Sequence, residues 1–151
     1  MSQSSRIAVV DALMMRALAI NDRQAFPEEL RAFDTAFQAR RFRMLITDGI
    51  LDEYQTESNK FPPFQQELRV TINGLNRLGR VIYFDDYRLN RTTININGLP
   101  QEHTCFVYDA IAARASHLIT NRQPWLDLSP QTEASYGLQI VSPPRFVDLE
   151  G

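Results

Sequence analysis

The sequence predicts an α/β fold: a single three-layer domain with a central parallel sheet of about five strands. Short apolar runs alternate with helix-like segments along the chain, and parallel strands need such helical crossovers. The length of 151 residues fits one compact domain with a sizeable core, so we expect a single domain over residues 1–151. A hydrophobic content of 44% argues against disorder.

The first half of the chain repeats a strand-then-helix pattern. Residues 7–10 (IAVV) form the first expected strand, and residues 12–20 follow as a helix. A second helix is expected from Pro27 to about Phe42, because proline suits the first helical position and apolar residues recur at helical spacing. Residues 44–47 (MLIT) then predict a second strand.

A short helix is expected over residues 50–54, and a longer amphipathic one follows the double proline at 62–63. The third expected strand is 81–84 (VIYF). Residues 88–100 differ, because polar and apolar residues alternate there before a turn pair. We expect an inserted loop or a short edge hairpin in this segment.

The last third of the chain completes the pattern. Residues 106–113 carry one helical apolar stripe, and strands are expected at 118–120 and 138–141. The phenylalanines at 33, 37 and 42, together with Trp125, are expected in the core or in a dimer face rather than in a base-stacking platform.

Composition limits the setting and the partners. With Cys105 as the only cysteine, a disulfide scaffold is impossible, and no apolar run approaches the roughly 18 residues of a membrane span. The first residues lack the layout of a signal peptide, so we expect a cytoplasmic protein without a membrane partner. A net charge of −2 argues against capture of nucleic acid by the whole surface. Any such binding requires a local patch.

Several common α/β sites are excluded. The six glycines cannot form a dinucleotide-binding fingerprint or a P-loop, and no serine lies in a G-x-S-x-G elbow. Lys60 is the only lysine among 16 basic residues, so the late-strand lysine of a receiver domain has no counterpart. His103 and Cys105 point apart on a helix, which argues against a catalytic Cys–His pair.

Carboxylates remain as candidates, because ligands of open α/β sheets lie beyond the carboxyl ends of the strands. Asp11 ends the first apolar run, and a buried carboxylate needs a partner. The candidate partners are a metal ion, an arginine or a helix N-terminus. On the next helix Ile50 marks the buried face. At about 100° per residue, Glu53 lies about 60° from Ile50 and Asp52 about 160° away. Glu53 is therefore expected to approach the sheet edge, and Asp52 to be solvated.

Four segments together resemble a PIN domain, the fold of many metal-dependent ribonucleases, including toxins of bacterial toxin–antitoxin pairs. The segments are 7–13 (IAVVDAL), 45–54 (LITDGILDEY), 106–125 (FVYDAIAARASHLITNRQPW) and 136–149 (YGLQIVSPPRFVDL). Between them, residues 55–102 match only in the order of elements. The resemblance implies a metal-dependent endoribonuclease that holds Mg²⁺ or Mn²⁺ with clustered carboxylates.

Carried over residue by residue, the resemblance preserves half of that acidic site. Asp11 and Glu53 match the first two acidic positions, as metal ligands and catalytic residues. Thr104 and Arg122 stand at the third and fourth positions and depart from the family pattern. If Arg122 points inward, its charge is expected to pair with Asp11 and replace the cation. Thr104 is expected to cap a helix rather than to bind a metal.

Three hypotheses follow. The first is a degenerate PIN module that binds RNA or a protein partner with weak or no nuclease activity. The second is an active nuclease in which another carboxylate completes the site; the candidates are Glu102, Asp85, Asp86 and Asp109. Asp109 lies five residues beyond Thr104, about 140° and 7.5 Å further along the helix, and is not expected to reach the same point. The third is an α/β interaction subunit whose Asp11 has a structural partner only.

The sequence leaves the partners open. Arg40, Arg41 and Arg43 form the densest basic cluster and are the candidate RNA contacts, although the end of a solvated helix looks the same. The resemblance also implies a homodimer and an antitoxin-like protein partner.

Overall fold

The computed structural model describes residues 6–20, 27–85 and 89–150. Its centre is a five-stranded, all-parallel sheet with the strand order β3-β2-β1-β4-β5. The strands are β1 (Ile7–Val10), β2 (Arg43–Ile46), β3 (Val81–Tyr83), β4 (His117–Ile119) and β5 (Gln139–Val141). The predicted α/β class and strand number are confirmed.

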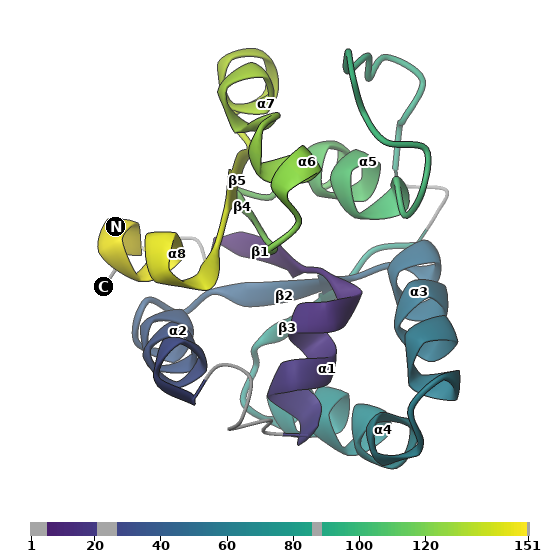
Figure 1. Cartoon of the computed structure of the whole chain (residues 1–151), viewed down its shortest axis with the longest axis vertical. Coiled ribbons are helices and arrows are strands. Elements are labelled where there is room, and N and C mark those ends of the chain that lie inside the picture. The colour runs from purple at the N-terminus through teal and green to yellow at the C-terminus, as the bar shows by residue number, and fades with distance from the viewer. Residues whose placement is uncertain (1–5, 21–26, 86–88, 151) are drawn as a thin grey trace.

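Within the described residues, eight helices flank the sheet. They are α1 (Ala12–Ile20), α2 (Pro27–Ala39), α3 (Asp48–Asn59), α4 (Pro62–Arg77), α5 (Cys105–Ala112), α6 (Gln123–Leu126), α7 (Ser129–Tyr136) and α8 (Pro143–Glu150). Helices α5, α6 and α7 lie on one side of the sheet, and α1, α2 and α4 lie on the other (Figure 1). Right-handed crossovers explain this division, because the chain moves first towards β3 and then back towards β5. The outcome is a three-layer domain.

The central strand β1 explains why its sequence is a continuous apolar run. Ala8 pairs with Met44 on one side and with His117 on the other, so β1 has a neighbour along both edges. Helices cover both of its faces, and Ala8, Val9 and Val10 are fully buried. A strand that is buried on both faces has no polar alternation to show.

Aromatic side chains join the amino ends of the strands to two helices. Phe33 of α2 packs against Phe146 of α8, with ring centroids 5.1 Å apart, and Phe42 lies 5.0 Å from Phe146. Trp125 is 2% exposed and packs against Phe106. The expectation that these aromatic residues belong to the core is confirmed.

The segment expected as a loop or an edge hairpin is a loop in the described residues 89–104. Leu89 and Ile96 are buried, so the loop is anchored to the core. The main-chain N–H of Asn95 donates to the Tyr136 hydroxyl over 2.9 Å, and the N–H of Asn97 donates to Gln131 Oε1 over 2.9 Å. These side chains of α7 satisfy backbone groups that a hairpin partner would otherwise bind.

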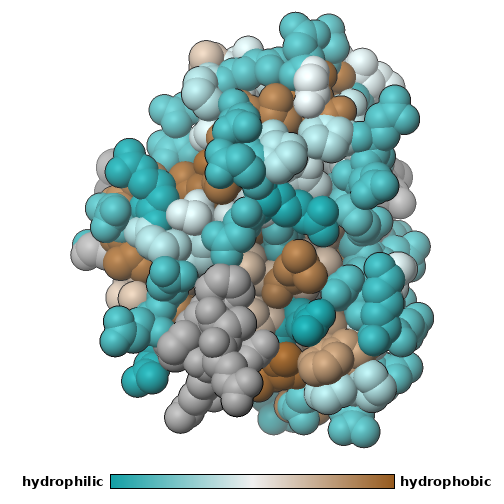
Figure 2. Space-filling model, in the orientation of Figure 1, coloured by the Kyte–Doolittle hydropathy of each residue, from teal (hydrophilic) through white to brown (hydrophobic). Residues whose placement is uncertain are grey.

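In the view of Figure 2 apolar residues show at several places within a largely hydrophilic surround, among them the area below the centre, where α1 lies in Figure 1. Leu13 of α1 is 41% exposed. On the same helix, the Arg16 guanidinium lies 4.3 Å from the centroid of the Phe61 ring. None of the helices in the described ranges has the length and apolar character needed to cross a membrane.

Candidate acidic site at the carboxyl edge of the sheet

Asp11 lies at the carboxyl end of β1, where the strand order changes direction between β2 and β4. This is the position at which open α/β sheets bind their ligands. The Asp11 side chain is 1% exposed, and its Oδ1 accepts a 2.8 Å hydrogen bond from the main-chain N–H of Met14. Met14 is the third residue of α1, so Asp11 is the N-cap of that helix.

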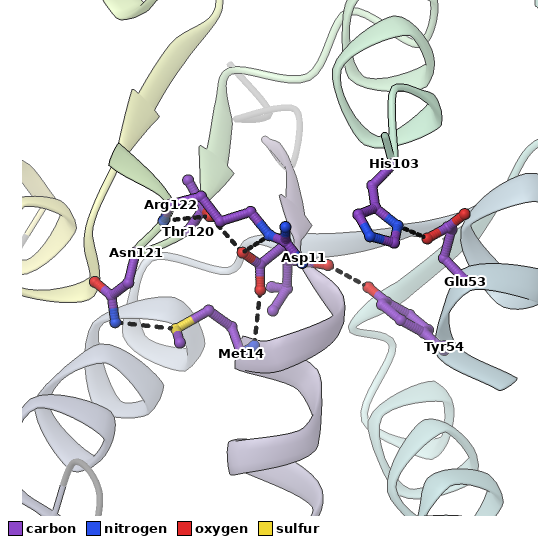
Figure 3. A network of polar contacts seen from close by, with 9 residues as sticks. Asp11, Met14, Glu53, Tyr54, His103, Thr120, Asn121 and Arg122 are labelled. Atoms are coloured by element: carbon purple, nitrogen blue, oxygen red, sulfur yellow. Dashed lines mark hydrogen bonds and ion pairs between the residues drawn. The ribbon is translucent and has the colours of Figure 1, made fainter. Parts of the chain in front are cut away.

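The second carboxylate oxygen of Asp11 faces β4 and the residues after it. It accepts a hydrogen bond from the Thr120 hydroxyl, and Arg122 Nε lies 3.9 Å from it (Figure 3). The expected pairing of Arg122 with Asp11 is therefore confirmed. Burial raises the pKa of Asp11, while the Thr120 and Met14 hydrogen bonds and the charge of Arg122 oppose that rise.

Arg122 is held beside Asp11 by its main chain and by a ring. Its main-chain N–H donates to Thr120 Oγ1 over 3.0 Å, and its guanidinium carbon lies 5.2 Å from the centroid of the Trp125 ring. Arg122 Nε is buried and has no hydrogen-bond partner in the part of the chain that the structure describes. The contact with Asp11 is thus a charge interaction, longer than a hydrogen bond.

Glu53 lies at the same edge of the sheet but faces a different partner. Its carboxylate pairs with Nδ1 of His103, whose backbone has a left-handed φ of 58°. In Figure 3 this pair stands apart from Asp11, whose carboxylate points towards Thr120 and Arg122. Asp52 is exposed, as the helical angle predicts. Asp11 and Glu53 therefore do not converge on one point.

Thr104 occupies the N-cap position of α5, but its side chain makes no capping hydrogen bond. Its main-chain carbonyl accepts the N–H of Tyr108 over 3.0 Å. The expected position is confirmed, and the expected side-chain cap is wrong. Thr104 has an αR backbone, with φ −63° and ψ −22°, whereas a side-chain cap normally sits on an extended one.

Asp109 is fully buried and has two partners of its own. Its Oδ2 accepts from the Thr47 hydroxyl over 2.6 Å, and its Oδ1 lies 2.6 Å from Arg91 Nε. Thr47 in turn caps α3, because its Oγ1 accepts the N–H of Ile50 over 3.0 Å. A side chain at Gly49 would bring a Cβ within 3.5 Å of Asp109 Oδ2. This cluster joins three segments of the chain. Both oxygens of the Asp109 carboxylate are bound within it, so Asp109 does not complete an acidic site with Asp11.

The other candidate carboxylates are exposed or lie outside the described residues. Glu102 and Asp85 are exposed, and Asp86 lies outside the described residues. The basic cluster lies around the start of β2, at the opposite edge of the sheet from Asp11. Arg40 Nε donates to the carbonyl of Glu150 over 2.7 Å and Arg41 is exposed, while Arg43 Nε is buried without a hydrogen-bond partner among described residues.

Within the described ranges, no group of three or more His, Cys, Asp or Glu side chains is arranged to hold a metal ion. Both Asp11 oxygens already accept hydrogen bonds, and a cation there would meet the charge of Arg122. The donor set in this arrangement therefore does not fit a divalent cation, which needs several oxygen ligands.

The chain matches no family model, no curated protein and no solved structure. The site therefore has to be interpreted from its own residues.

Sequence reasoning missed one member of this edge. Arg91, in the irregular loop, is the partner of Asp109, and nothing distinguishes it from the other 14 arginines in the sequence. A helix N-terminus was one of the partners that the sequence left open for Asp11, and the capping bond to Met14 confirms it. Asp109, an acidic residue inside the apolar stripe of residues 106–113, was a sign that a basic or polar partner had to exist, since a buried carboxylate needs one.

Proposed function

We propose that this chain is a PIN-like module in which the Arg122 guanidinium occupies the place of the catalytic metal ion, and which binds single-stranded RNA without cleaving it. The observation that carries the proposal is Arg122 Nε, 3.9 Å from Asp11 Oδ2 at the strand-order switch point. A fixed guanidinium neutralises the carboxylate as an ion would. It supplies no metal-bound water, and hydrolysis by this family needs one.

The Glu53–His103 pair supports the same proposal, because the second family carboxylate is also engaged by a side chain of the protein. RNA is the ligand that the resemblance favours, with exposed Arg41 and neighbouring Arg40 as its candidate contacts. Homodimer formation, an antitoxin-like protein partner and a cytoplasmic location belong to the same proposal. Light scattering of the purified protein tests the dimer.

The test incubates purified protein with end-labelled single-stranded RNA, with Mn²⁺, with Mg²⁺ or with a chelator. We expect the RNA to be bound and to stay intact in all three conditions, and titration calorimetry to detect no Mn²⁺ binding. Arg41→Ala should weaken RNA binding, and Arg145→Ala serves as the matched exposed control. Because phosphate contacts release counterions, the affinity should fall steeply with salt. Absence of RNA binding would contradict the proposal and favour a protein partner.

An active nuclease is the second candidate. The observation that favours it is the length of the Arg122–Asp11 contact, since Arg122 Nε has no hydrogen-bond partner among the described residues to hold it against displacement by a cation. In that case Mg²⁺ or Mn²⁺ would bind Asp11, and Glu53 would have to leave His103. Metal-dependent cleavage that Asp11→Asn abolishes would establish this second candidate and overturn the first.

A further inference from the structure

A cleft lies between α3 and α4, beside the carboxyl ends of β2 and β3. Its volume is about 480 Å³, within the range of sites for small organic ligands. Its apolar lining comes from four side chains, Ile46, Leu51, Leu68 and Ile72. The two helices pack against each other in the lower part of Figure 1, so the cleft has two helical walls.

The helical walls explain why the cleft is separate from the acidic site. On α3 the lining residues are Leu51, Gln55, Ser58 and Asn59, at the i, i+4, i+7 and i+8 spacing of one helix face. On α4 they are Gln65, Leu68, Arg69, Ile72 and Asn73, again on one face. Glu53, which belongs to the acidic site, lies about 200° around α3 from Gln55. The cleft and the acidic site therefore use opposite faces of α3.

Amide side chains stand on these two faces where paired helices usually carry apolar ones. Of the four amides, Asn59 and Gln65 are joined by a 3.3 Å hydrogen bond from Gln65 Nε2 to Asn59 Oδ1. The amides of Gln55 and Asn73 have no partner among the residues that the structure describes. Each amide offers two N–H donors and one carbonyl acceptor. This is the pattern needed to bind the edge of a nucleobase.

Two more lining residues fit the rest of a nucleotide. Tyr83, the last residue of β3, is 53% exposed and pairs in register with Ile46, so an aromatic ring stands at the mouth of the cleft. Arg69 is exposed and makes no ion pair in the described part of the chain. Aromatic rings stack on bases, and a guanidinium binds phosphate through two hydrogen bonds. The described lining contains no carboxylate that would repel the phosphate.

We propose that the α3–α4 cleft binds a nucleoside monophosphate unit, with its base between Tyr83 and the amides and its phosphate on Arg69. The unit is either a free nucleotide or one residue of a single-stranded RNA. The inference goes beyond the acidic site and does not depend on whether Asp11 supports hydrolysis.

Titration calorimetry with the four ribonucleoside 5′-monophosphates, their nucleosides and a five-nucleotide single-stranded RNA tests this inference. We expect at least one monophosphate to bind in the millimolar range or tighter. Its nucleoside should bind more weakly, because the Arg69 contact is lost. Tyr83→Ala should weaken binding by about tenfold or more, while Tyr83→Phe should retain it. Arg69→Ala should make the monophosphate and its nucleoside bind alike.

Arg77→Ala is the matched control, since Arg77 is an exposed arginine of α4 that does not line the cleft. A five-nucleotide RNA that binds much more tightly than any monophosphate would identify RNA as the source of the unit, and the reverse would identify a free nucleotide. The inference is overturned if none of the probes binds, or if binding survives both Tyr83→Ala and Arg69→Ala unchanged. Loss of RNA binding in Arg41→Ala leaves the mononucleotide result unaffected, so the two proposals fail separately.

Discussion

The hydroxyl of Tyr54 on α3 donates a 2.6 Å hydrogen bond to the main-chain carbonyl of Val10, the last residue of β1. The bond ties the helix that carries Glu53 to the strand that leads into Asp11. Tyr54 is fully buried, and burial raises its pKa well above the usual range, so the phenol stays a donor. The neutral Tyr54 hydroxyl therefore fixes this edge of the sheet, by joining the element that carries Glu53 to the strand that leads into Asp11.

Tyr54→Phe removes this hydroxyl donor, so the Val10 carbonyl loses the hydrogen bond. We expect the free energy of unfolding to fall by about 1–2 kcal/mol, the usual cost of an unmade buried hydrogen bond. Urea unfolding followed by circular dichroism measures the change. Tyr83→Phe is the control, since Tyr83 is 53% exposed and should change stability by less than about 0.5 kcal/mol. Equal stability of the two variants would contradict the assigned role of the Tyr54 hydroxyl.

Asp109→Asn tests the cluster that anchors the irregular loop. The amide keeps the size of the carboxylate but loses the charge that Arg91 meets at 2.6 Å. Arg91 is 37% exposed, so we expect a loss of about 2 kcal/mol in unfolding free energy, less than for a fully buried pair. Asp52→Asn, at an exposed position of α3, should be neutral. If the loop is anchored here, amide hydrogen exchange in residues 89–104 should also accelerate in Asp109→Asn. An unchanged exchange rate would count against the anchoring role.

Much of the sheet could be predicted because its three central strands, β2, β1 and β4, are buried. β1 and β2 show that burial directly as apolar runs, and the helical angle by itself separates buried-side Glu53 from exposed Asp52. Residues 93–98 were ambiguous for a physical reason. Their alternation suits a strand, but a strand also needs a partner, and here side chains of α7 take the hydrogen bonds instead.

The site was only partly predictable, because its contacts join distant segments. The pairing of Arg122 with Asp11 was predicted only because the resemblance to a PIN domain puts Arg122 at an acidic position of that family. By contrast, Arg91 and Asp109 are 18 residues apart across an irregular loop, a separation that no helical or strand period relates. The amides of the α3–α4 cleft carry no signal in one sequence, because glutamine and asparagine are common on exposed helix faces.

Asp11→Asn should reveal the ionisation of the buried carboxyl. Burial raises the pKa of Asp11 in the folded protein above the value of about 3.9 in unfolded chains. Between the unfolded and the folded pKa of Asp11, the folded state therefore binds more protons than the unfolded state. The contribution of Asp11 to stability falls as pH rises through the folded pKa. Because asparagine does not ionise, the stability of the variant relative to wild type should increase from pH 4 upward. Thermal unfolding of both proteins between about pH 4 and pH 7 measures this difference in stability. A relative stability that decreases with pH would show that the partners of Asp11 outweigh its burial.

His117 is expected to make the fold sensitive to acid. Its ring is 3% exposed, lies edge-on to Phe42 and Phe146, and its Nδ1 is 2.7 Å from Ser116 Oγ. Burial lowers its pKa to about 4, opposed by the charge of Glu150 and assisted by that of Arg6.

The sign of the effect follows from where the proton binds. The unfolded chain takes up a proton near pH 6.5 and the folded protein only near pH 4, so stability is complete above pH 6.5 and is lost as pH falls towards 4. The full loss corresponds to about 3 kcal/mol. His117→Phe keeps the edge-on ring contacts and cannot ionise. Its unfolding free energy, from urea titrations at several values between pH 4 and pH 7, should therefore vary less with pH than that of wild type. His103→Gln, the variant of the other histidine, should retain the acid sensitivity caused by His117. A wild-type slope that persists in His117→Phe would assign the sensitivity to other groups.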